Sequence, residues 1–440
     1  MAREMKDSGV AWIGEIPSTW SIQRMKNCIA SRQSGAWGDD ATGETGDAIC
    51  LRIADFDYAR FRFKETPVEE LTVRHYAQDV IERLKLAKGD ILIEKSGGGE
   101  KTPVGRTVIF DKDYTALYAN FMDCLRCTSA VYPQFMQYVF VTFYKNNYSR
   151  NYIKQTTGIQ NLDLTAMLAT EVVATPPIDE QICIATFLDR KCAEIDSVIL
   201  DTQRTIEEYK RLKQSIITEA VTKGVRGKRI TKDSDIEWVG AIPVEWNIMV
   251  AFQIFKQVKE KNEGLVEQNL LSLSYGKIKR KSIDTVGGLL PENFDGYNII
   301  EANDIVLRLT DLQNDHTSLR VGLSNERGIV TSAYVTLRNH SQNNPLYLYY
   351  YLHAFDICKG FYGMGAGVRQ GLNWDGIKML KFVIPPVDEQ QEITAYLETK
   401  CAEIDRLIVS KQQLLEEMES YKKSVIYEYV TGKKEVPVCQ

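Results

Sequence analysis

Two segments of the chain occur twice, at two different offsets. Residues 176–222 align without gaps on residues 385–431, and 23 of 47 positions are identical at this offset of 209. Residues 7–22 align on residues 233–248 at an offset of 226, and both copies contain the pattern W-x-G-x-I-P-x-x-W. A repeat on this scale predicts two structural halves that share a frame.

The segments between the repeated ends differ from each other. These two inserts, residues 21–175 and 247–384, differ by 17 residues in length and share only scattered matches. Similar frames therefore hold dissimilar inserts, which indicates a scaffold that presents two different recognition modules. With 440 residues, 44% of them hydrophobic, the chain is long enough for about two to four packed domains.

Each closing repeat has the spacing of a long amphipathic helix. A Pro-Pro pair stands just before each expected helix start, where proline is tolerated. Apolar residues then recur in the three-four alternation of a heptad seam, which passes the polar positions Thr202 and Lys411 and runs through Leu212 and Tyr421 to Ile216 and Val425. The predicted seam residues are Leu188, Cys192, Ile195, Ile199, Ile206 and Tyr209 in the first copy, and Leu397, Cys401, Ile404, Ile408, Leu415 and Met418 in the second.

A helix with an apolar seam needs a partner, and the other copy is the obvious one. We therefore expect an α+β protein in which two mixed α/β domains are separated by two long helices that form an antiparallel coiled coil, with a pseudo-twofold internal repeat. The alternative is two independent helices, each packed on its own domain. The predicted segments are a first domain at 1–175, a central helical spacer at 176–223, a second domain at 224–384 with a linker at 224–232, and a C-terminal helical spacer at 385–440.

The chain lacks the sequence patterns of a catalytic site. Residues 96–102, SGGGEKT, resemble a phosphate-binding loop, but Glu100 stands where the pattern needs a glycine, so a Lys-bearing surface loop beside DNA phosphates is a better interpretation. Residues 344–347, NPLY, lack the second proline of the adenine methyltransferase motif and suit a helix start. The four histidines form no triad, and the pair Cys124 and Cys127 lacks further zinc ligands. We expect no catalysis, metal or cofactor in this chain alone.

The net charge of −5 argues against nucleic-acid binding, but the charge is unevenly distributed. The acids concentrate in residues 233–246 and 385–440, whereas the inserts are nearly neutral and carry local basic clusters. Polar loops at 154–161 and 365–371 add Gln, Asn and Arg, which can contact base edges. The candidate DNA-binding residues are Lys95, Lys101, Arg106, Lys154, Gln155, Thr157, Gln160, Asn161, Lys277, Lys279, Arg280, Lys281, Arg369 and Gln370.

The sequence also predicts a cellular location. The N-terminus lacks the apolar region of a signal peptide, and no apolar run reaches the roughly 18 residues of a membrane span. Nine cysteines at irregular spacing suit reduced thiols better than a disulfide framework. We expect a cytoplasmic protein.

Taken together, these features resemble the specificity (S) subunits of type I restriction–modification enzymes, the HsdS family. The resemblance covers essentially the whole chain, and the double frame is highly specific. Within the loops the match is less regular, because Gly371 stands where the first loop has Leu162. The features that carry it are the W-x-G-x-I-P-x-x-W openings after Asp7 and Asp233, the loops at Gly158 and Gly367, and the PPxDEQ helix starts at Pro176 and Pro385.

This resemblance implies a function and a set of partners. Each insert would be a target recognition domain that reads one half of a bipartite, asymmetric double-stranded DNA site, and the helices would set the distance between the halves. The partners implied are two methyltransferase subunits, which bind S-adenosylmethionine and methylate adenine, and restriction subunits, which use ATP and Mg²⁺. PPxDEQ would occur twice because each copy starts one helix and presents the same face to one kind of partner.

Two other functions stay open at this stage. A self-sufficient methyltransferase or nuclease would bind S-adenosylmethionine or a metal as a purified chain. A coiled-coil scaffold that joins two protein partners would show no salt-dependent binding to DNA.

Overall fold

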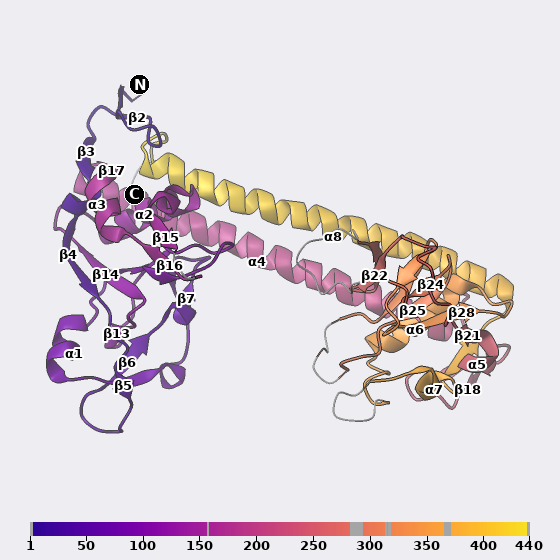
Figure 1. The fold of residues 1–440 in the computed structure, drawn as a ribbon. Coiled ribbons are helices and arrows are strands. Elements are labelled where there is room, and N and C mark those ends of the chain that lie inside the picture. The colour runs from indigo at the N-terminus through magenta and orange to yellow at the C-terminus, as the bar shows by residue number, and fades with distance from the viewer. Residues whose placement is uncertain are drawn as a thin grey trace. The chain divides into compact units, whose positions relative to one another are not determined.

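The computed structural model describes residues 3–155, 158–281, 294–312, 315, 318–364 and 371–437 (Figure 1). The chain divides into two compact units: unit 1 contains residues 1–203 and 413–440, and unit 2 contains residues 204–412. Two long helices, α4 (Ile178–Lys223) and α8 (Val387–Val430), contribute residues to both units. Each helix begins two residues after the start predicted for its spacer, directly after the Pro-Pro pair.

A six-stranded sheet forms the centre of the first insert, in unit 1. Its third strand is buried along its whole length because the two faces of the sheet pack on different clusters. Ile91 and Ile93 face the cluster that contains Phe135, whereas Leu92 faces the cluster that contains Phe110, as the two-residue period of a strand requires. The strand order is β4 (Ile29–Ser34), β14 (Met122–Cys127), β10 (Ile91–Glu94), β12 (Thr107–Ile109), β8 (Arg62–Phe63) and β7 (Phe56–Asp57).

Smaller sheets and short helices complete unit 1. The helices are α1 (Gln78–Leu84), α2 (Pro133–Lys145) and α3 (Leu164–Thr170), with 3-10 turns at Met25–Cys28, Ile53–Asp55, Val68–Glu70 and Tyr148–Tyr152. The sheets are β1 (Met5–Asp7) with β2 (Glu15–Pro17); β11 (Ser96–Gly97), β16 (Gln160–Leu162) and β15 (Ile153–Gln155); β13 (Ala116–Tyr118), β6 (Asp47–Leu51), β9 (Val73–His75) and β5 (Asp39–Asp40); and β17 (Val172–Thr175) with β3 (Ser21–Arg24).

Unit 2 is built around a four-stranded sheet and one central helix. The sheet order is β21 (Phe255–Gln257), β28 (Val335–Asn339), β25 (Ile305–Leu307) and β26 (Val321–Leu323). The helices are α5 (Ala251–Ile254), α6 (Pro345–Ile357) and α7 (Trp374–Ile377). Four two-stranded sheets surround them: β18 (Thr231–Asp233) with β19 (Ala241–Pro243), β20 (Asn247–Val250) with β29 (Lys381–Ile384), β22 (Leu271–Ser274) with β23 (Lys277–Arg280), and β24 (Asn298–Ile300) with β27 (Gly328–Val330).

The ends of each insert pair with each other. In unit 1, Ser21 pairs with Thr175 across β3 and β17, and in unit 2, Asn247 pairs with Ile384 across β20 and β29. These four residues are the first and last residues of the inserts that the repeat defines. Each insert therefore leaves and re-enters the frame at one antiparallel strand pair, which closes it as a separate module.

The antiparallel helix pair is confirmed within each unit. In unit 1, Asp196 of α4 pairs with Lys422 of α8, and Phe187 contacts Tyr429 with ring centroids 4.5 Å apart, so the two helices run in opposite directions. The seam positions predicted for the coiled coil are buried or half-buried, except Leu212 and Tyr421. The helices also join the domain cores, because both main clusters contain residues of α4 and α8. Pairing and packing on the domains thus occur together.

The predicted seam is wrong near its C-terminal ends. Leu212 and Tyr421 are exposed, and the inward positions belong instead to Lys213, which is half-buried, and Lys422, which is buried. The lysines can occupy a seam because each ammonium meets a carboxylate of the other helix: Lys213 Nζ lies 2.7 Å from Asp405, and Lys422 Nζ lies 2.6 Å from Asp196.

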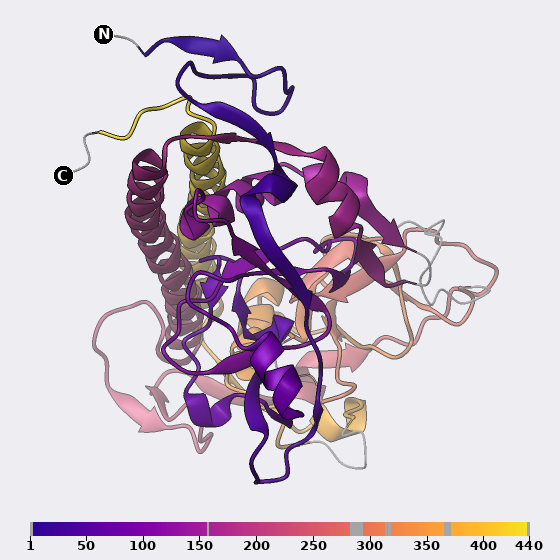
Figure 2. The same ribbon diagram turned by 90° about the vertical axis from the view of Figure 1, so that its left-hand side faces the viewer.

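The N-terminal strands and the end of α8 pack together in unit 1 (Figure 2). Tyr427 Oη donates a hydrogen bond to the carbonyl of Trp12 at 3.0 Å, and Trp12 packs edge to face on Phe143 of α2. The repeated opening motif is therefore part of the same core as the repeated helix.

Two further expectations can be compared with the structure. Seven cysteines in the described residues, among them the strand residues Cys124 and Cys127, have free thiols as predicted, whereas Cys183 is disulfide-bonded. Among the helices that the structure describes, none carries an apolar stretch long enough to cross a membrane.

Candidate nucleic-acid interface

A three-stranded sheet brings together two polar segments that are about sixty residues apart in the sequence. Ser96 pairs with Asn161 and Gly97 pairs with Gln160 across β11 and β16. The Ser96 hydroxyl donates to Asn161 Oδ1 at 2.7 Å. The Lys-bearing Gly-rich loop and the Gln/Asn loop, predicted separately, therefore form one surface. Thr157, the remaining candidate in this loop, lies outside the described residues.

Lys95 is held beside this sheet by a buried carboxylate. Its ammonium lies 2.7 Å from Asp123, which is fully buried, and donates to the Ser34 hydroxyl at 2.8 Å. Arg32 Nε lies 2.6 Å from the other oxygen of Asp123. Burial would raise the pKa of Asp123, but hydrogen bonds from Lys95, Arg32 and Ser34 outweigh it and the pKa is lowered. One carboxylate thus orients two cations. This pairing fixes the Lys95 side chain, but it also partly neutralises its charge.

Arg106 is paired with a buried carboxylate, and its predicted DNA contact stays a prediction. Its guanidinium donates to both oxygens of buried Glu94, at 2.7 and 3.0 Å, and lies over the ring of Tyr58 at 3.7 Å from the centroid. Burial raises the pKa of Glu94, and the pairing with Arg106 acts against this rise. Because removing the partner of a buried carboxylate is strongly destabilising, this geometry favours a structural role for Arg106 over phosphate contact.

The other candidates of unit 1 vary in exposure. Lys101 is exposed, and no ion pair or hydrogen bond of its side chain occurs within the described residues. Lys154 is also exposed, although its ammonium lies 2.7 Å from Asp163. Gln155 and Asn161 are exposed, whereas Gln160 is buried and accepts a hydrogen bond from the Val104 N–H at 3.3 Å. Lys101, Lys154, Gln155 and Asn161 can therefore reach a ligand, and Gln160 supports the loop.

In unit 2 the candidate lysines lie on one hairpin. β22 and β23 pair from Leu271 with Arg280 to Ser274 with Lys277, and the connecting Tyr275 and Gly276 both have positive φ angles, 49° and 75°, as a tight two-residue hairpin turn requires. Ile278 packs on the core below the hairpin, so the alternation of a strand turns Lys277 and Lys279 outward.

The remaining candidates of unit 2 are divided. Lys281 follows the hairpin and is exposed. Arg280 faces the other side of the strand and pairs with Glu326, with an Nε to Oε1 distance of 2.8 Å. Arg369 and Gln370 lie outside the described residues. The DNA contacts predicted for all these residues stay predictions.

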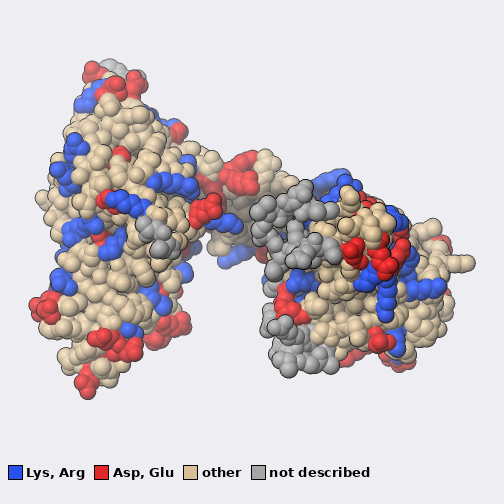
Figure 3. Space-filling model, viewed as in Figure 1, with Lys and Arg blue, Asp and Glu red and all other residues tan. Residues whose placement is uncertain are grey.

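Charge is unevenly spread over one face of unit 1. Figure 3 shows Lys and Arg over the middle of the first insert, while Asp and Glu gather at the end that carries β5. Asp39, Asp40, Glu44 and Asp47 lie in and around that strand. A polyanion would therefore meet the middle of this domain more favourably than its acidic end.

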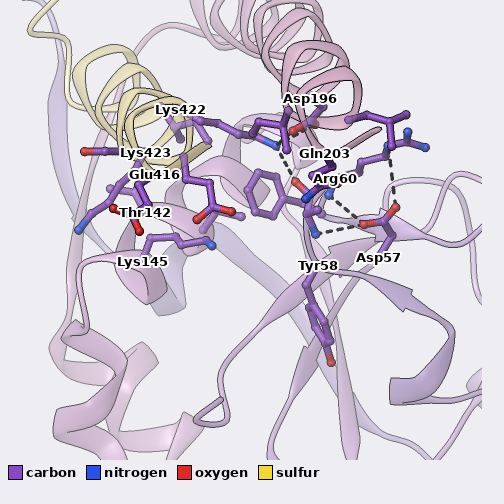
Figure 4. A pocket seen from close by; sticks show the side chains of 18 residues that line it. Asp57, Tyr58, Arg60, Thr142, Lys145, Asp196, Gln203, Glu416, Lys422 and Lys423 are labelled. Atoms are coloured by element: carbon purple, nitrogen blue, oxygen red, sulfur yellow. Dashed lines mark hydrogen bonds and ion pairs between the residues drawn. The ribbon is translucent and has the colours of Figure 1, made fainter. Parts of the chain in front are cut away.

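A cavity of about 830 Å³ opens in unit 1 where α2, α4, α8 and the loop at residues 57–61 meet (Figure 4). Lys422 ties its walls together, because its ammonium donates to the carbonyl of Ala59 at 2.6 Å as well as to Asp196. Burial lowers the pKa of Lys145 on the α2 wall. Cations and acids such as Glu416 alternate around the cavity, so its charge selects no one kind of ligand.

The repeated PPxDEQ motif is used inside each unit. In unit 1, Glu180 accepts a hydrogen bond from the indole Nε1–H of Trp20 at 3.1 Å and pairs with Arg3 at 2.7 Å. Gln181 accepts from the Tyr132 N–H at 2.8 Å, at the N-terminus of α2, and donates to the carbonyl of Pro176. The glutamate thus holds the opening motif, and the glutamine holds the insert.

Unit 2 repeats these contacts with corresponding residues. Glu389 accepts from the indole of Trp246 at 3.1 Å and pairs with Arg229 at 2.6 Å. Gln390 accepts from the Asn344 N–H at 2.8 Å, at the N-terminus of α6. These four Glu and Gln side chains therefore face their own units, and the expectation that both helices present the same face to one kind of partner stays a prediction about other positions of the helices. Sequence comparison could have suggested the pairing, because Trp and Glu are repeated together.

The family model and the known proteins that resemble this chain all carry the description of type I restriction specificity. The family described as the Type I restriction modification DNA specificity domain matches residues 243–419. The chain is 22% identical to the putative type I restriction enzyme MjaX specificity subunit of Methanocaldococcus jannaschii, over 96% of this chain and 95% of that protein. It is also 22% identical to the StySPI specificity subunit of Salmonella potsdam, over 80% of this chain and 76% of that protein.

Solved structures share the fold. A chain from a type I restriction–modification system, studied for its complex assembly and conformational transition, superposes with a TM-score of 0.68 at 11% identity, over 95% of this chain and 99% of that one. The HsdS subunit from Thermoanaerobacter tengcongensis superposes with a TM-score of 0.50 at 12% identity, over 95% and 98%.

Proposed function

Because this chain belongs to the specificity subunits of type I restriction–modification enzymes, which recognise DNA sequence and are not catalytic themselves, we propose how its two halves divide that task. Each recognition domain reads one half of a bipartite, asymmetric DNA site. The helices hold the two recognition domains at a fixed distance from each other. The observation that carries this proposal is that two unlike domains are mounted on one duplicated frame by corresponding contacts, Glu180 with Trp20 and Glu389 with Trp246.

The closure of each insert supports independent reading. Each insert starts and ends on one antiparallel strand pair, Ser21 with Thr175 and Asn247 with Ile384. A module attached in this way can differ in sequence without changing the frame. Unlike inserts then read unlike half-sites, so the DNA target is not palindromic.

Exposed apolar residues at repeated positions support docking of two identical partners. Exposed apolar side chains recur on the two helices at an offset of 209, so both copies of the repeat present corresponding residues to two copies of one protein. The matching pairs are Ile178 with Val387, Val198 with Leu407, Leu200 with Val409, and Leu212 with Tyr421. We assign these surfaces to two methyltransferase subunits.

The chemistry then belongs to other chains. In this proposal the methyltransferase subunits bind S-adenosylmethionine and methylate adenine, and restriction subunits use ATP and Mg²⁺. This cytoplasmic chain recognises the DNA sequence and supplies the surfaces on which the partners dock. Its net charge of −5 suits a subunit whose partners provide much of the phosphate contact. Equal DNA affinity of the isolated chain and of the complex would contradict that last point.

The first test is to co-express the chain with its candidate methyltransferase subunit and to map methylated adenines across a host genome by single-molecule sequencing. A bipartite motif with a fixed unspecified gap is the expected result. A stable complex that binds S-adenosylmethionine but methylates no motif would contradict the proposal and favour the scaffold. A chain that methylates DNA without the partner would favour the self-sufficient enzyme.

A domain exchange sharpens this test. Residues 21–175 are replaced by the corresponding insert of another specificity subunit, joined at the strand pair of β3 and β17. One half of the methylated motif should change while the other half and the gap stay the same. The matched control replaces residues 247–384 and should change the opposite half only.

A further inference from the structure

An apolar pocket of about 450 Å³ lies between two exposed aromatic side chains of the first recognition domain. Trp37 is 41% exposed and Phe121 is 48% exposed, and Ile53 and Ala54 line the pocket between them. All six tryptophans of the chain lie in described residues, and Trp37 is the one among them that is exposed. Large aromatics left at the surface around a hollow indicate a binding site.

Trp37 is held by its neighbours. Arg74 lies over the Trp37 ring at 4.9 Å from its centroid, and Arg74 is itself anchored by Asp40 and by the Gly38 carbonyl. The Tyr76 hydroxyl donates to the carbonyl of Trp37 at 3.1 Å. The indole is therefore oriented by its neighbours although it is not buried, which lowers the entropy lost when a flat ligand stacks on it.

The pocket is continuous with the predicted DNA surface. The Phe121 carbonyl accepts hydrogen bonds from the Lys95 N–H at 2.9 Å and from the Ser96 N–H at 3.3 Å, so Phe121 is fixed to the start of the Gly-rich loop. Arg52 and Asn120 also line the pocket, and Asn120 is exposed. The wall of the pocket is almost entirely apolar, which suits the face of a base, and Arg52 is paired with Asp55 at 3.3 Å.

We propose that this pocket takes a nucleobase that is unstacked from the DNA helix in the half-site read by the first domain. Trp37 and Phe121 stack on the base, and Lys95 and Lys101 hold the flanking phosphates. The base differs from the methylated adenine, because methyl transfer takes place on the partner subunit. This inference rests on the proposed function and adds a site at which the first domain reads by stacking.

The test is a cycle of protein and DNA changes in the complex with the methyltransferase subunit. The DNA carries the mapped target with one abasic nucleotide at each position of the first half-site in turn. Trp37→Ala should weaken binding to the intact target by about 10-fold to 100-fold, since base–aromatic stacking contributes on that order. At one position, the loss caused by the abasic nucleotide should disappear in Trp37→Ala and in Phe121→Ala.

Matched variants separate stacking from folding. Trp37→Phe keeps an aromatic face and should bind within about 3-fold of the natural chain. Phe252, 49% exposed in unit 2, gives the control Phe252→Ala, which should leave every position of the scan unchanged. Trp37→Phe also identifies the fluorescence of Trp37, which cognate DNA should protect from acrylamide.

Other outcomes overturn the inference and leave the proposed function distinguishable. If Trp37→Ala methylates the same bipartite motif with unchanged affinity and unchanged abasic profile, the pocket takes no base although the chain still recognises DNA. If Trp37→Ala instead prevents assembly with the methyltransferase subunit, the pocket is a protein contact. If no motif exists at all, the proposed function itself is wrong.

Discussion

Glu180 and Glu389 occupy corresponding positions in the two copies of the repeat, but their surroundings differ. The side chain of Glu180 is 27% exposed and pairs with Arg3, which is itself partly exposed. The side chain of Glu389 is fully buried and pairs with Arg229 through two short contacts, 2.6 and 2.9 Å. The same chemical link is thus at the surface in unit 1 and internal in unit 2.

The lysine links between the helices differ in the opposite sense. Lys422 and Asp196 of unit 1 are both largely buried, with side chains 9% and 15% exposed. Lys213 and Asp405 of unit 2 are 26% and 48% exposed. This difference in exposure comes from the recognition domain of unit 1, where the centroid of the Phe61 ring lies 4.8 Å from the Lys422 ammonium.

The two differences together show what the repeat conserves and what it leaves to the inserts. The frame keeps the identity of each partner, so both halves make the same contacts. The insert decides how much water reaches them, and burial decides how much a pair contributes, because surface pairs are screened and buried ones leave an uncompensated charge when broken. Corresponding substitutions should therefore have unequal effects.

The largest inequality is expected at the helix–helix lysines. Asp196→Asn leaves Lys422 nearly buried without a counter-charge and should destabilise unit 1 by about 3–5 kcal/mol. The matched control is Asp405→Asn. Because Lys213 is already partly exposed to water, this change should lower the free energy of unfolding of unit 2 by about 1 kcal/mol or less. Hydrogen exchange of α4 and α8 measures both effects locally. Equal losses in the two units would show that the recognition domain does not shield Lys422.

The next inequality should appear at the glutamates and favour the other unit. Glu389→Gln keeps an acceptor for Trp246 but removes the buried charge that faces Arg229, and should destabilise unit 2 by about 2–3 kcal/mol. Glu180→Gln should cost unit 1 about 1 kcal/mol or less, because Arg3 remains solvated. The measurement is the exchange rate of amides in α2 and α6, which the adjacent glutamines anchor. A larger loss in Glu180→Gln would reverse the comparison.

A pH difference between the units should be smaller. Burial, the largest cause, and the charge of Lys213 lower the pKa of His353 in α6 to about 4. Between pH 6.5 and 4 the unfolded chain then binds more protons than the folded chain, so this histidine makes unit 2 less stable as the pH falls. From pH 7 to 4.5 we expect a loss of about 2 kcal/mol.

The control for this prediction must cancel a neighbour that acts in the opposite direction. Burial raises the pKa of Asp356 to about 6, so this carboxyl gains protons on folding between pH 3.8 and 6 and stabilises unit 2 as the pH falls. The quantity to measure is therefore the difference between the natural chain and His353→Phe, whose ring can still stack on Tyr349. A difference that does not change with pH would contradict a neutral His353.

Periodic and repeated features of the fold could be predicted from sequence. The helix starts and the seam positions such as Leu188 and Leu397 follow from local spacing, and the insert ends at Ser21 and Thr175 follow from where the repeat stops. These patterns need no knowledge of distant residues, because a seam needs only a regular period and a repeat needs only a second copy.

Features that depend on a distant partner could not be predicted. Lys213 looks like a surface residue until Asp405 of the other helix is placed beside it. Arg106 looks like a DNA contact until Glu94 on the neighbouring strand occupies its guanidinium. In both cases the sequence shows a cationic side chain, and only the fold shows that a carboxylate already pairs with it.

The salt dependence of DNA binding tests this last distinction with the smallest expected effect. Lys277 and Lys279 are turned outward on their hairpin and have no ion-pair partner among the described residues. Lys277→Gln and Lys279→Gln should each reduce the slope of log affinity against log salt by about 0.9, the value for one lost phosphate contact. The comparison variant is Arg106→Lys in unit 1, which should destabilise the pair with Glu94 and leave the slope unchanged, because its charge already faces a carboxylate. If Arg106→Lys stays as stable as the natural chain and lowers the slope, Arg106 belongs to the DNA interface as the sequence predicts.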